Sequence, residues 1–264
     1  MKTSVIDLEG KPIREVELPK VFQTRYRPDL IRRAVVALQT HRLQPKGRDP
    51  MAGKRTTAES YGVGHGLARV PRVKGERHPR AGSAAFAPGT VKGRLAHPPR
   101  AEKVIEKKIN RKERKLALAS AIAATGVREL IEKRGHVIDG IESFPIIVSD
   151  EIQKLDRTSR VIEALKGIGV WKDVERVLSR EKILPRGSRS RGRVKRIPRG
   201  PLIVVGSDEG IVRGARNIPG VDVVTLNKLN VELLAPGTHA GRLTLWSESA
   251  IMGLEKLFEG VALH

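Results

Sequence analysis

Cysteine, aromatic side chains and long apolar runs are all scarce in this sequence of 264 residues. Cysteine is absent, which excludes disulfides and thiolate metal ligands and is typical of a reducing compartment. The longest apolar runs, such as Leu202 to Val205, are far too short to span a bilayer. No apolar stretch of the kind found in secretory signals follows Met1. We therefore expect a soluble protein with no membrane partner.

Negative charge is also in short supply. The chain has 51 Lys and Arg against 29 Asp and Glu, which gives a net charge of +22. Because so large an excess would repel itself in a compact monomer, it indicates a polyanionic partner. Only 39% of the residues are apolar, so part of the chain is not expected to pack in a core. The length is sufficient for one or two domains.

The excess charge is concentrated in two segments. Residues 42–100 hold thirteen Lys and Arg against three acids, and residues 182–199 hold eight against none. The rest of the chain carries an ordinary surface charge. We expect both segments to bind the polyanion. The candidate contacts are Arg42, Lys46, Arg48, Lys54, Arg55, Arg69, Arg72, Lys74, Arg77, Arg80, Lys92, Arg94 and Arg100 in the first segment, and Arg186, Arg189, Arg191, Arg193, Lys195 and Arg196 in the second.

The first segment has the composition of a long loop. It contains nine Gly and seven Pro and no sustained apolar period, so it is either functional or a disordered basic linker. Apolar side chains such as Tyr61, Val63, Leu67 and Phe86 are spaced among its basic residues. A solvated tail gains nothing from them, whereas a segment buried in RNA can stack or wedge them. We favour a loop that threads into folded RNA.

Outside these segments, short apolar runs alternate with helical periodicity. Such alternation predicts an α/β fold, with a mostly parallel sheet flanked by helices. The body then comprises residues 1–41 and 101–264, with residues 42–100 as a long basic loop between two helices and residues 182–200 as a second basic loop. We expect a hairpin over residues 4–18 that turns at Gly10, and buried strands at 144–149, 202–205, 221–224 and 243–246. Helices are expected from Pro28, from Asn110 to about Gly126, up to Gly135, over 161–168 and 171–178, from about Asn227, and from Ser247 to Phe258. Asn110 and Glu113 are expected to form a capping pair at the start of the second of these helices.

Two glycine-rich stretches superficially resemble phosphate-binding loops. Gly62, Gly64 and Gly66 alternate, but no strand precedes them and Pro71 follows in place of a helix, which argues against a nucleotide site. Residues 206–210 do follow a predicted strand, so a phosphate nest is conceivable there. The more economical interpretation is a turn into a helix capped by Ser207 or Asp208.

The sequence offers no catalytic or metal-binding constellation. Its seven histidines are scattered without the spacing of metal ligands, and no serine lies in a Gly-x-Ser-x-Gly motif. We expect no enzyme activity, no metal, no cofactor and no small-molecule substrate.

Residues 62–75, GVGHGLARVPRVKG, and residues 78–89, HPRAGSAAFAPG, resemble the loop of the large-subunit ribosomal protein four family, in its archaeal and eukaryotic branch. The basic stretch NRKERKLAL at residues 110–118 is similar to the helix that follows this loop in the family, and RGSRSRGR at residues 186–193 suits the archaeal type. The chain ends soon after its last predicted helix, without the long basic tail of eukaryotic relatives, which also favours the archaeal type.

The resemblance implies a Rossmann-like α/β body and an extended loop that runs through ribosomal RNA (rRNA) and helps to line the polypeptide exit tunnel. It implies a cytoplasmic protein of translation, within the large ribosomal subunit, whose partners are large-subunit rRNA, neighbouring ribosomal proteins and the nascent peptide near the loop tip. Eukaryotic members often have a basic residue where this chain has His65. Carried onto this sequence, the tip comprises Tyr61, Gly62, Gly64, His65, Gly66, Arg69 and Pro71, and Arg111 and Lys112 join the rRNA contacts.

Two alternatives remain at this level. A general basic nucleic-acid-binding protein or RNA chaperone would bind duplex DNA about as well as rRNA. An RNA-modifying enzyme with a Rossmann body would bind a cofactor such as S-adenosylmethionine.

Overall fold

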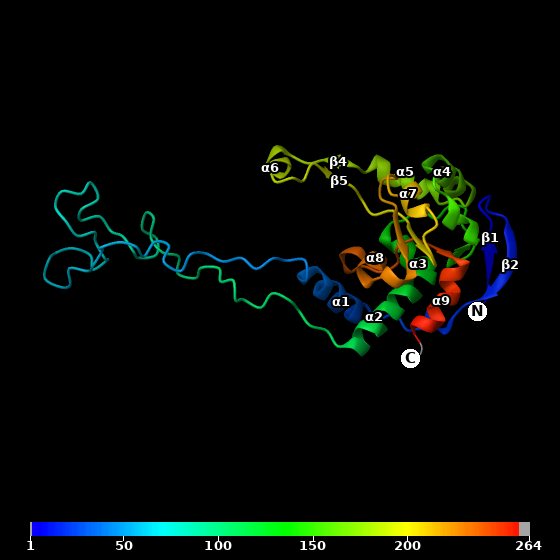
Figure 1. Cartoon of the computed structure of the whole chain (residues 1–264), viewed down its shortest axis with the longest axis horizontal. Helices are drawn as coiled ribbons and strands as arrows, with labels where there is room; N and C mark the ends of the chain where they lie inside the picture. The colour runs from blue at the N-terminus through cyan, green and yellow to red at the C-terminus, as the bar shows by residue number, and fades with distance from the viewer. Residues whose placement is uncertain (1, 259–264) are drawn as a thin grey trace. The chain divides into compact units, whose positions relative to one another are not determined.

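The computed structural model (Figure 1) describes residues 2–258, and its α/β part is built on a six-stranded sheet of order β2-β1-β3-β8-β6-β7. The edge strand β2 is antiparallel to β1, and all other neighbours are parallel, which confirms the predicted mostly parallel sheet. The strands are β1 (Lys2–Ile6), β2 (Pro12–Glu17), β3 (Ile146–Val148), β6 (Leu202–Val205), β7 (Asp222–Thr225) and β8 (Thr244–Ser247).

The central strands are buried along their whole length. Every residue of β3, β6 and β8 is buried, as continuous apolar runs predict for strands covered on both faces. The hairpin of β1 and β2 turns at Gly10, as expected, with a φ of +86° that favours glycine. A Cβ at Gly10 would lie 2.4 Å from the carbonyl oxygen of Gly167, so the turn can approach the neighbouring helix only without a side chain.

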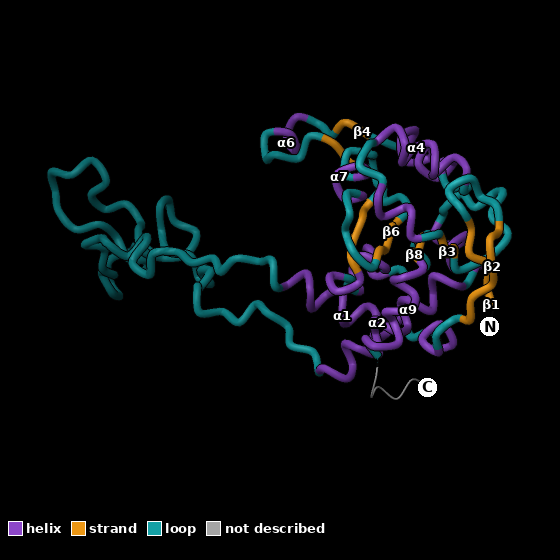
Figure 2. The backbone as a smooth tube through the Cα atoms, turned by 45° about the vertical axis from the view of Figure 1, so that its right-hand side comes forward, coloured by secondary structure: helices purple, strands orange, loops and turns teal. Residues whose placement is uncertain are grey.

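Helices cover both faces of the sheet (Figure 2). One apolar cluster joins Ile147, Val204 and Trp246 to α1, α2, α8 and α9, and a second joins Ile203 and Leu245 to α3, α4, α5 and α7. The expected α/β class is thereby confirmed. These helices are α1 (Pro28–Thr40), α2 (Arg111–Ala123), α3 (Arg128–Arg134), α4 (Thr158–Gly167), α5 (Trp171–Ser179), α7 (Ile211–Ala215), α8 (Val231–Leu234) and α9 (Glu248–Leu257).

Most helix boundaries follow the expected signals. α1 begins at Pro28, and α9 is capped by Ser247, whose Oγ accepts a hydrogen bond from the amide of Ala250 at 3.3 Å. Gly135 ends α3 with a φ of +91°, which relieves the strain that a side chain would meet there.

Three expected caps and starts were wrong in detail. Asn110 holds the N-cap position of α2, but its side chain makes no capping hydrogen bond, and Glu113 instead pairs with Arg33 of α1 at 3.2 Å. The helix expected from Asn227 is a 3-10 turn (Leu226–Lys228), and α8 starts after the side-chain cap of Asn230. At α2 the pairing of Glu113 with Arg33 occupies the carboxylate that the capping pair needs, so a tertiary contact overrides the local signal. Gly210 rather than Ser207 or Asp208 holds the N-cap of α7, although Asp208 Oδ1 accepts from the amides of Gly210 and Val212.

The second basic segment folds as a small hairpin. β4 (Lys182–Ile183) pairs with antiparallel β5 (Lys195–Arg196), and α6 (Arg186–Arg189) lies between them. All residues of β4 and β5 are exposed, so the hairpin adds no core to the body. We call residues 182–196 the basic hairpin.

The chain divides into two compact units, one of residues 1–39 and 107–264 and the other of residues 40–106. We call the first the body and the second the loop unit. Apart from Thr40, the last residue of α1, the loop unit holds no helix or strand, and isolated bridges join Arg72 to Glu59 and to Ala84. Within residues 2–258, no helix is long and apolar enough to cross a membrane.

Candidate nucleic-acid interface

The loop unit presents its basic side chains to solvent. Of the thirteen Lys and Arg expected to bind RNA in residues 42–100, ten are exposed and three are half-buried. Arg55 and Lys74 form surface ion pairs with Asp49 and Glu59. Such pairs contribute little stability, because both partners remain hydrated. These side chains can therefore exchange their acidic partners for phosphates at small cost.

The three half-buried arginines hold the loop unit together. Arg72 donates to the carbonyl of Gly82 at 2.9 Å, and Arg80 donates to the carbonyl of Val91 at 3.2 Å. The guanidinium of Arg94 lies 5.8 Å from the ring centroid of Phe86, in reach of a cation–π contact. Their positions indicate a role in the conformation of the loop unit in addition to any contact with RNA.

A closed turn brings the predicted tip residues together. The backbones of Glu59 and Arg72 exchange two hydrogen bonds, of 3.0 and 2.9 Å, and Ser60 Oγ donates to the carbonyl of Arg69 at 3.0 Å. These bonds close a neck around residues 61–70, so that six of the predicted tip residues share one turn. Pro71 lies at the neck, between this turn and Arg72, and its carbonyl accepts a hydrogen bond from the amide of Ala85 at 2.9 Å.

Glycine and aromatic residues shape this turn. Gly62, Gly64 and Gly66 have φ values of +79°, +88° and +64°, and a Cβ on any of them would meet open space. The three glycines are therefore required by the backbone conformation, not by crowding. The rings of Tyr61 and His65 are tilted against each other, with their centroids 6.2 Å apart.

Large apolar side chains of the loop unit also face solvent. Val63, Val91 and Val104 are 76%, 76% and 85% exposed. Side chains of this kind gain free energy only when a partner covers them, at about 25 cal/mol per Å² of buried apolar surface. Together with the exposed cations, they give the loop unit the surface of a segment that is ordered by RNA.

The body offers two further basic surfaces. The predicted contacts Arg186, Arg189, Arg191, Arg193, Lys195 and Arg196 are all exposed on the basic hairpin, where Lys195 pairs with Glu181 at 2.6 Å. Arg111 and Lys112 are exposed in the first turn of α2. These cations are repelled by the partial positive charge of the helix N-terminus. A bound phosphate would be attracted to both and would offset that repulsion.

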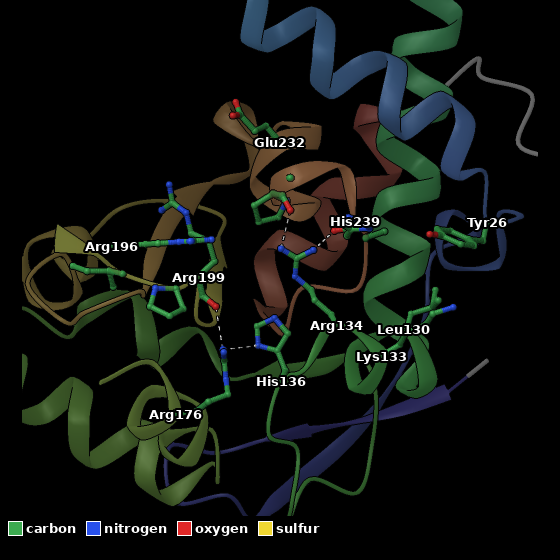
Figure 3. Close-up of a pocket in the computed structure, with 15 residues that line it drawn as sticks. Tyr26, Leu130, Lys133, Arg134, His136, Arg176, Arg196, Arg199, Glu232 and His239 are labelled. Carbon is green, nitrogen blue, oxygen red and sulfur yellow. Dashed lines mark hydrogen bonds between the residues drawn. The ribbon is translucent and has the colours of Figure 1, made fainter. Parts of the chain in front are cut away.

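A cationic cavity of about 910 Å³ lies in the body next to the basic hairpin. Lys133 and Arg134 reach it from the end of α3, Arg176 from α5, Arg196 from the end of β5, and Arg199 from the chain that follows β5 (Figure 3). Arg134 Nη2 donates to the carbonyl of Pro236 at 2.9 Å, and Nη1 donates to the carbonyl of His239. We call this the arginine pocket.

A buried carboxylate supports the floor of the arginine pocket. Asp173 is fully buried and accepts hydrogen bonds from His136 at 2.9 Å, Arg176 at 2.8 Å and the amide of Val137 at 3.0 Å. Burial alone would raise the pKa of Asp173, but the bonds from His136 and Arg176 outweigh it and lower the pKa to about 2. Burial also lowers the pKa of His136, so its ring is neutral at pH 7 and donates Nδ1–H to the carboxylate.

The carboxyl ends of the parallel strands, where open α/β sheets bind ligands, hold an interlocked polar cluster. After β3 the chain runs to α4 on one face, and after the adjacent β8 it runs to α9 on the other. The amide of Gln153 lies between these ends, donating to Ser249 Oγ at 2.6 Å and accepting from Ser207 Oγ at 2.8 Å. In the expected turn at residues 206–210, the amide and the Oγ of Ser207 therefore donate to the Gln153 side chain and not to a phosphate.

Sequence reasoning missed the arginine pocket. Its cationic side chains come from positions up to 66 residues apart, Lys133 to Arg199, and no local pattern relates them. One signal was available, because Asp173 interrupts the apolar stripe of Val170, Val174 and Val177, and an acid on a buried face requires partners. Among the described residues, no group of three or more His, Cys, Asp or Glu is placed to hold a metal ion.

Comparisons with known proteins cover almost the whole chain. The Ribosomal protein L4/L1 family matches residues 16–257. Large ribosomal subunit protein uL4 of Methanosphaera stadtmanae is 52% identical over 258 residues, which are 98% of each protein. The proteins of the same name from Methanopyrus kandleri and Sulfurisphaera tokodaii are 51% and 49% identical, over 97% and 98% of this chain and 98% and 96% of their own lengths. The resemblance seen in the loop motifs is thus confirmed along the chain, which belongs to the Ribosomal protein L4/L1 family.

Proposed function

We propose that this chain is a structural component of the large ribosomal subunit of a cytoplasmic archaeal-type ribosome and binds large-subunit rRNA. The observation that carries the proposal is the near-full-length match, at about half identity, to archaeal relatives named large ribosomal subunit protein uL4. The distribution of charge supports it, because the excess cations lie on the loop unit and the basic hairpin and not evenly over the body.

The mechanism is phosphate neutralisation and recognition of RNA shape, without catalysis. Each Lys or Arg that meets a phosphate releases condensed counterions, and glycine and proline fit the backbone into RNA crevices. Residues 42–100 form the rRNA-threading loop, residues 1–41 and 101–264 form a Rossmann-like body, and residues 182–200 provide a second contact. The interlocked cluster around Gln153 supports a structural role for the sheet, since its polar groups already bind one another.

The tip of the loop contacts the exit tunnel and the nascent peptide in this proposal. Its support is the closed turn at residues 61–70, which displays Tyr61, Val63 and His65 on an exposed glycine-rich backbone. A photoreactive amino acid at Val63, in large subunits that carry a stalled nascent chain, is expected to crosslink to that chain. The same group at exposed Val127 of the body should not. Equal crosslinking from both positions would refute the placement.

A comparison of RNA and DNA tests the proposed function against a general nucleic-acid-binding role. The full chain is expected to bind large-subunit rRNA at least about a hundredfold more tightly than duplex DNA of equal length, because shape recognition adds to a charge term common to both. Filter binding at a fixed, moderate salt concentration measures the ratio. Equal affinities would overturn the ribosomal function and favour a general basic binder.

A further inference from the structure

The arginine pocket contains more positive charge than the protein neutralises. Arg176 is matched by Asp173, and one carboxylate, Asp222, serves both Arg199 at 3.1 Å and the buried Arg242 at 2.7 Å. Across the described part of the chain, Lys133, Arg134 and Arg196 have no carboxylate within ion-pair distance. The residues that line the pocket include five Lys and Arg side chains and one acidic side chain, Glu232.

Arg134 is the focus of this excess. It is half-buried, and its two hydrogen bonds go to the neutral carbonyls of Pro236 and His239. Burial, followed by the nearby charges of Arg242 and Arg176, lowers its pKa to about 10. A guanidinium has five N–H donors, so three of those on Arg134 lack a partner in residues 2–258. A half-buried charge without a counter-charge is costly, and an anion in the cavity would offset that cost.

We propose that the arginine pocket is a phosphate-binding site, in which Arg134 and Arg196 donate to the oxygens of one phosphate group and Lys133 adds charge at the rim. The planar guanidinium fork matches phosphate geometry, and arginine is the side chain best suited to such recognition. His136 lies beside Arg176 in the pocket (Figure 3) and contributes shape and not charge, because its ring is neutral and hydrogen-bonded to Asp173.

The phosphate can come from an RNA strand or from a free anion such as pyrophosphate. RNA is the favoured source, because Arg196 belongs to both the arginine pocket and the basic hairpin, so that one strand on the hairpin would continue into the cavity. The choice of RNA as the source rests on the proposed function. The phosphate site itself does not.

The first arm of the test uses inorganic pyrophosphate and the full chain. Pyrophosphate at about ten times its Kd is expected to raise the Tm of the wild type by about 3–5 °C over chloride at equal ionic strength. The double variant K133Q/R196Q should lose this shift, because both side chains are exposed and make no internal hydrogen bond among the described residues. R134Q should weaken pyrophosphate binding at least about tenfold. Because R134Q also loses the hydrogen bonds to Pro236 and His239, the test of the phosphate site rests on K133Q/R196Q.

The control is R213Q/R216Q, which removes two exposed charges of the body outside the pocket. It should keep the full shift in Tm. A pyrophosphate shift that is absent in the wild type, or equal in K133Q/R196Q and wild type, would overturn the phosphate site. A glutamate oligopeptide that stabilises the wild type as strongly as pyrophosphate would assign the pocket to an acidic protein segment and overturn it as well.

The second arm identifies the source of the phosphate. Filter binding of large-subunit rRNA is expected to show at least about tenfold weaker binding by K133Q/R196Q than by R213Q/R216Q. If pyrophosphate binding depends on the pocket but rRNA binding is the same for both variants, a free phosphate-containing anion is the ligand. Comigration of the full chain with large subunits tests the proposed function separately, and neither arm depends on it.

Discussion

Asp173 illustrates how a single buried residue organises the body. Its carboxylate holds His136, Arg176 and the amide of Val137, and so joins α5 to the chain that follows α3. A paired buried charge contributes little net stability compared with apolar packing, but removal of one partner leaves the others unsatisfied. The network therefore fixes the position of Arg176, which forms part of the floor of the arginine pocket.

Replacement of Asp173 by Asn is expected to lower the free energy of unfolding by about 3 kcal/mol at pH 7, since Arg176 is left without its counter-charge. The folded-state pKa of Asp173, about 2, lies below the ordinary value of 3.8. The stabilisation by ionised Asp173 is therefore complete above about pH 4 and is lost as the pH falls toward 2. Urea unfolding should show the gap between wild type and D173N shrinking from pH 5 to pH 3.

The matched control for this charge removal is Asp139→Asn, at an exposed position. Its free energy of unfolding should differ from that of the wild type by less than about 0.5 kcal/mol at every pH. A gap between wild type and D173N that stays constant from pH 5 to pH 3 would contradict the assignment of the low pKa to Asp173.

Gly64 provides a second test at the scale of one residue. With its φ of +88° and open space around it, Gly64→Ala should strain the tip by about 1 kcal/mol without any clash, which weakens rRNA binding about fivefold. Gly187→Ala is the control, because a Cβ there also meets open space and its φ is not in the left-handed region. A competition assay for rRNA binding against the wild type measures the affinity of each variant. Equal binding by the two variants would refute the requirement for glycine at the tip.

At the scale of elements, the apolar pattern of the sequence predicted those helices and strands whose formation depends on burial of an apolar face. α1 buries Leu30, Ile31, Ala34 and Val35, which recur at helical spacing on one face, and the apolar run at β6 is buried throughout. The capping role of Asn110 and the helix from Asn227 could not be settled locally. Each competes with tertiary contacts, such as the pair of Glu113 with Arg33, that no local window contains.

The basic hairpin should act as one electrostatic element. Replacing Arg186, Arg189, Arg191 and Arg193 together by Gln is expected to reduce the slope of log K against log salt by about three to four, because each lost phosphate contact removes roughly 0.7–0.9. The control replaces four exposed arginines outside the hairpin, Arg157, Arg160, Arg213 and Arg216, by Gln. It has the same net charge but should change the slope by less than about one. Equal slopes for the two variants would show that only net charge matters.

At the scale of the whole molecule, the sequence predicted the class of fold and the location of the excess charge. Composition alone separated the basic segments from a near-neutral remainder, and the loop motifs indicated the family that the comparisons confirmed. The arginine pocket could not be predicted, because it depends on how α3, α5, the end of β5 and the chain after it meet in space. The contacts expected of individual basic residues with rRNA remain predictions.

The loop unit should be ordered by its partner. Fixing a residue costs about 1–2 kcal/mol of conformational entropy, and residues 40–106 bury few apolar groups of their own to offset it. Trypsin is therefore expected to cleave the free chain within residues 40–106 at least about ten times faster than the chain in large subunits. Mass spectrometry of the fragments locates the cuts. Equal rates would contradict ordering by RNA.

The central claim is that the chain is an integral part of the large ribosomal subunit, and sedimentation of the native protein tests it most directly. A peripheral basic protein held by charge alone would dissociate at about 0.5 M salt, where charges are screened over a few Å. We predict that the native chain comigrates with large subunits at that salt concentration, in a constant ratio to rRNA. Its recovery at the top of the gradient, or spread over all RNA-containing fractions, would contradict the account.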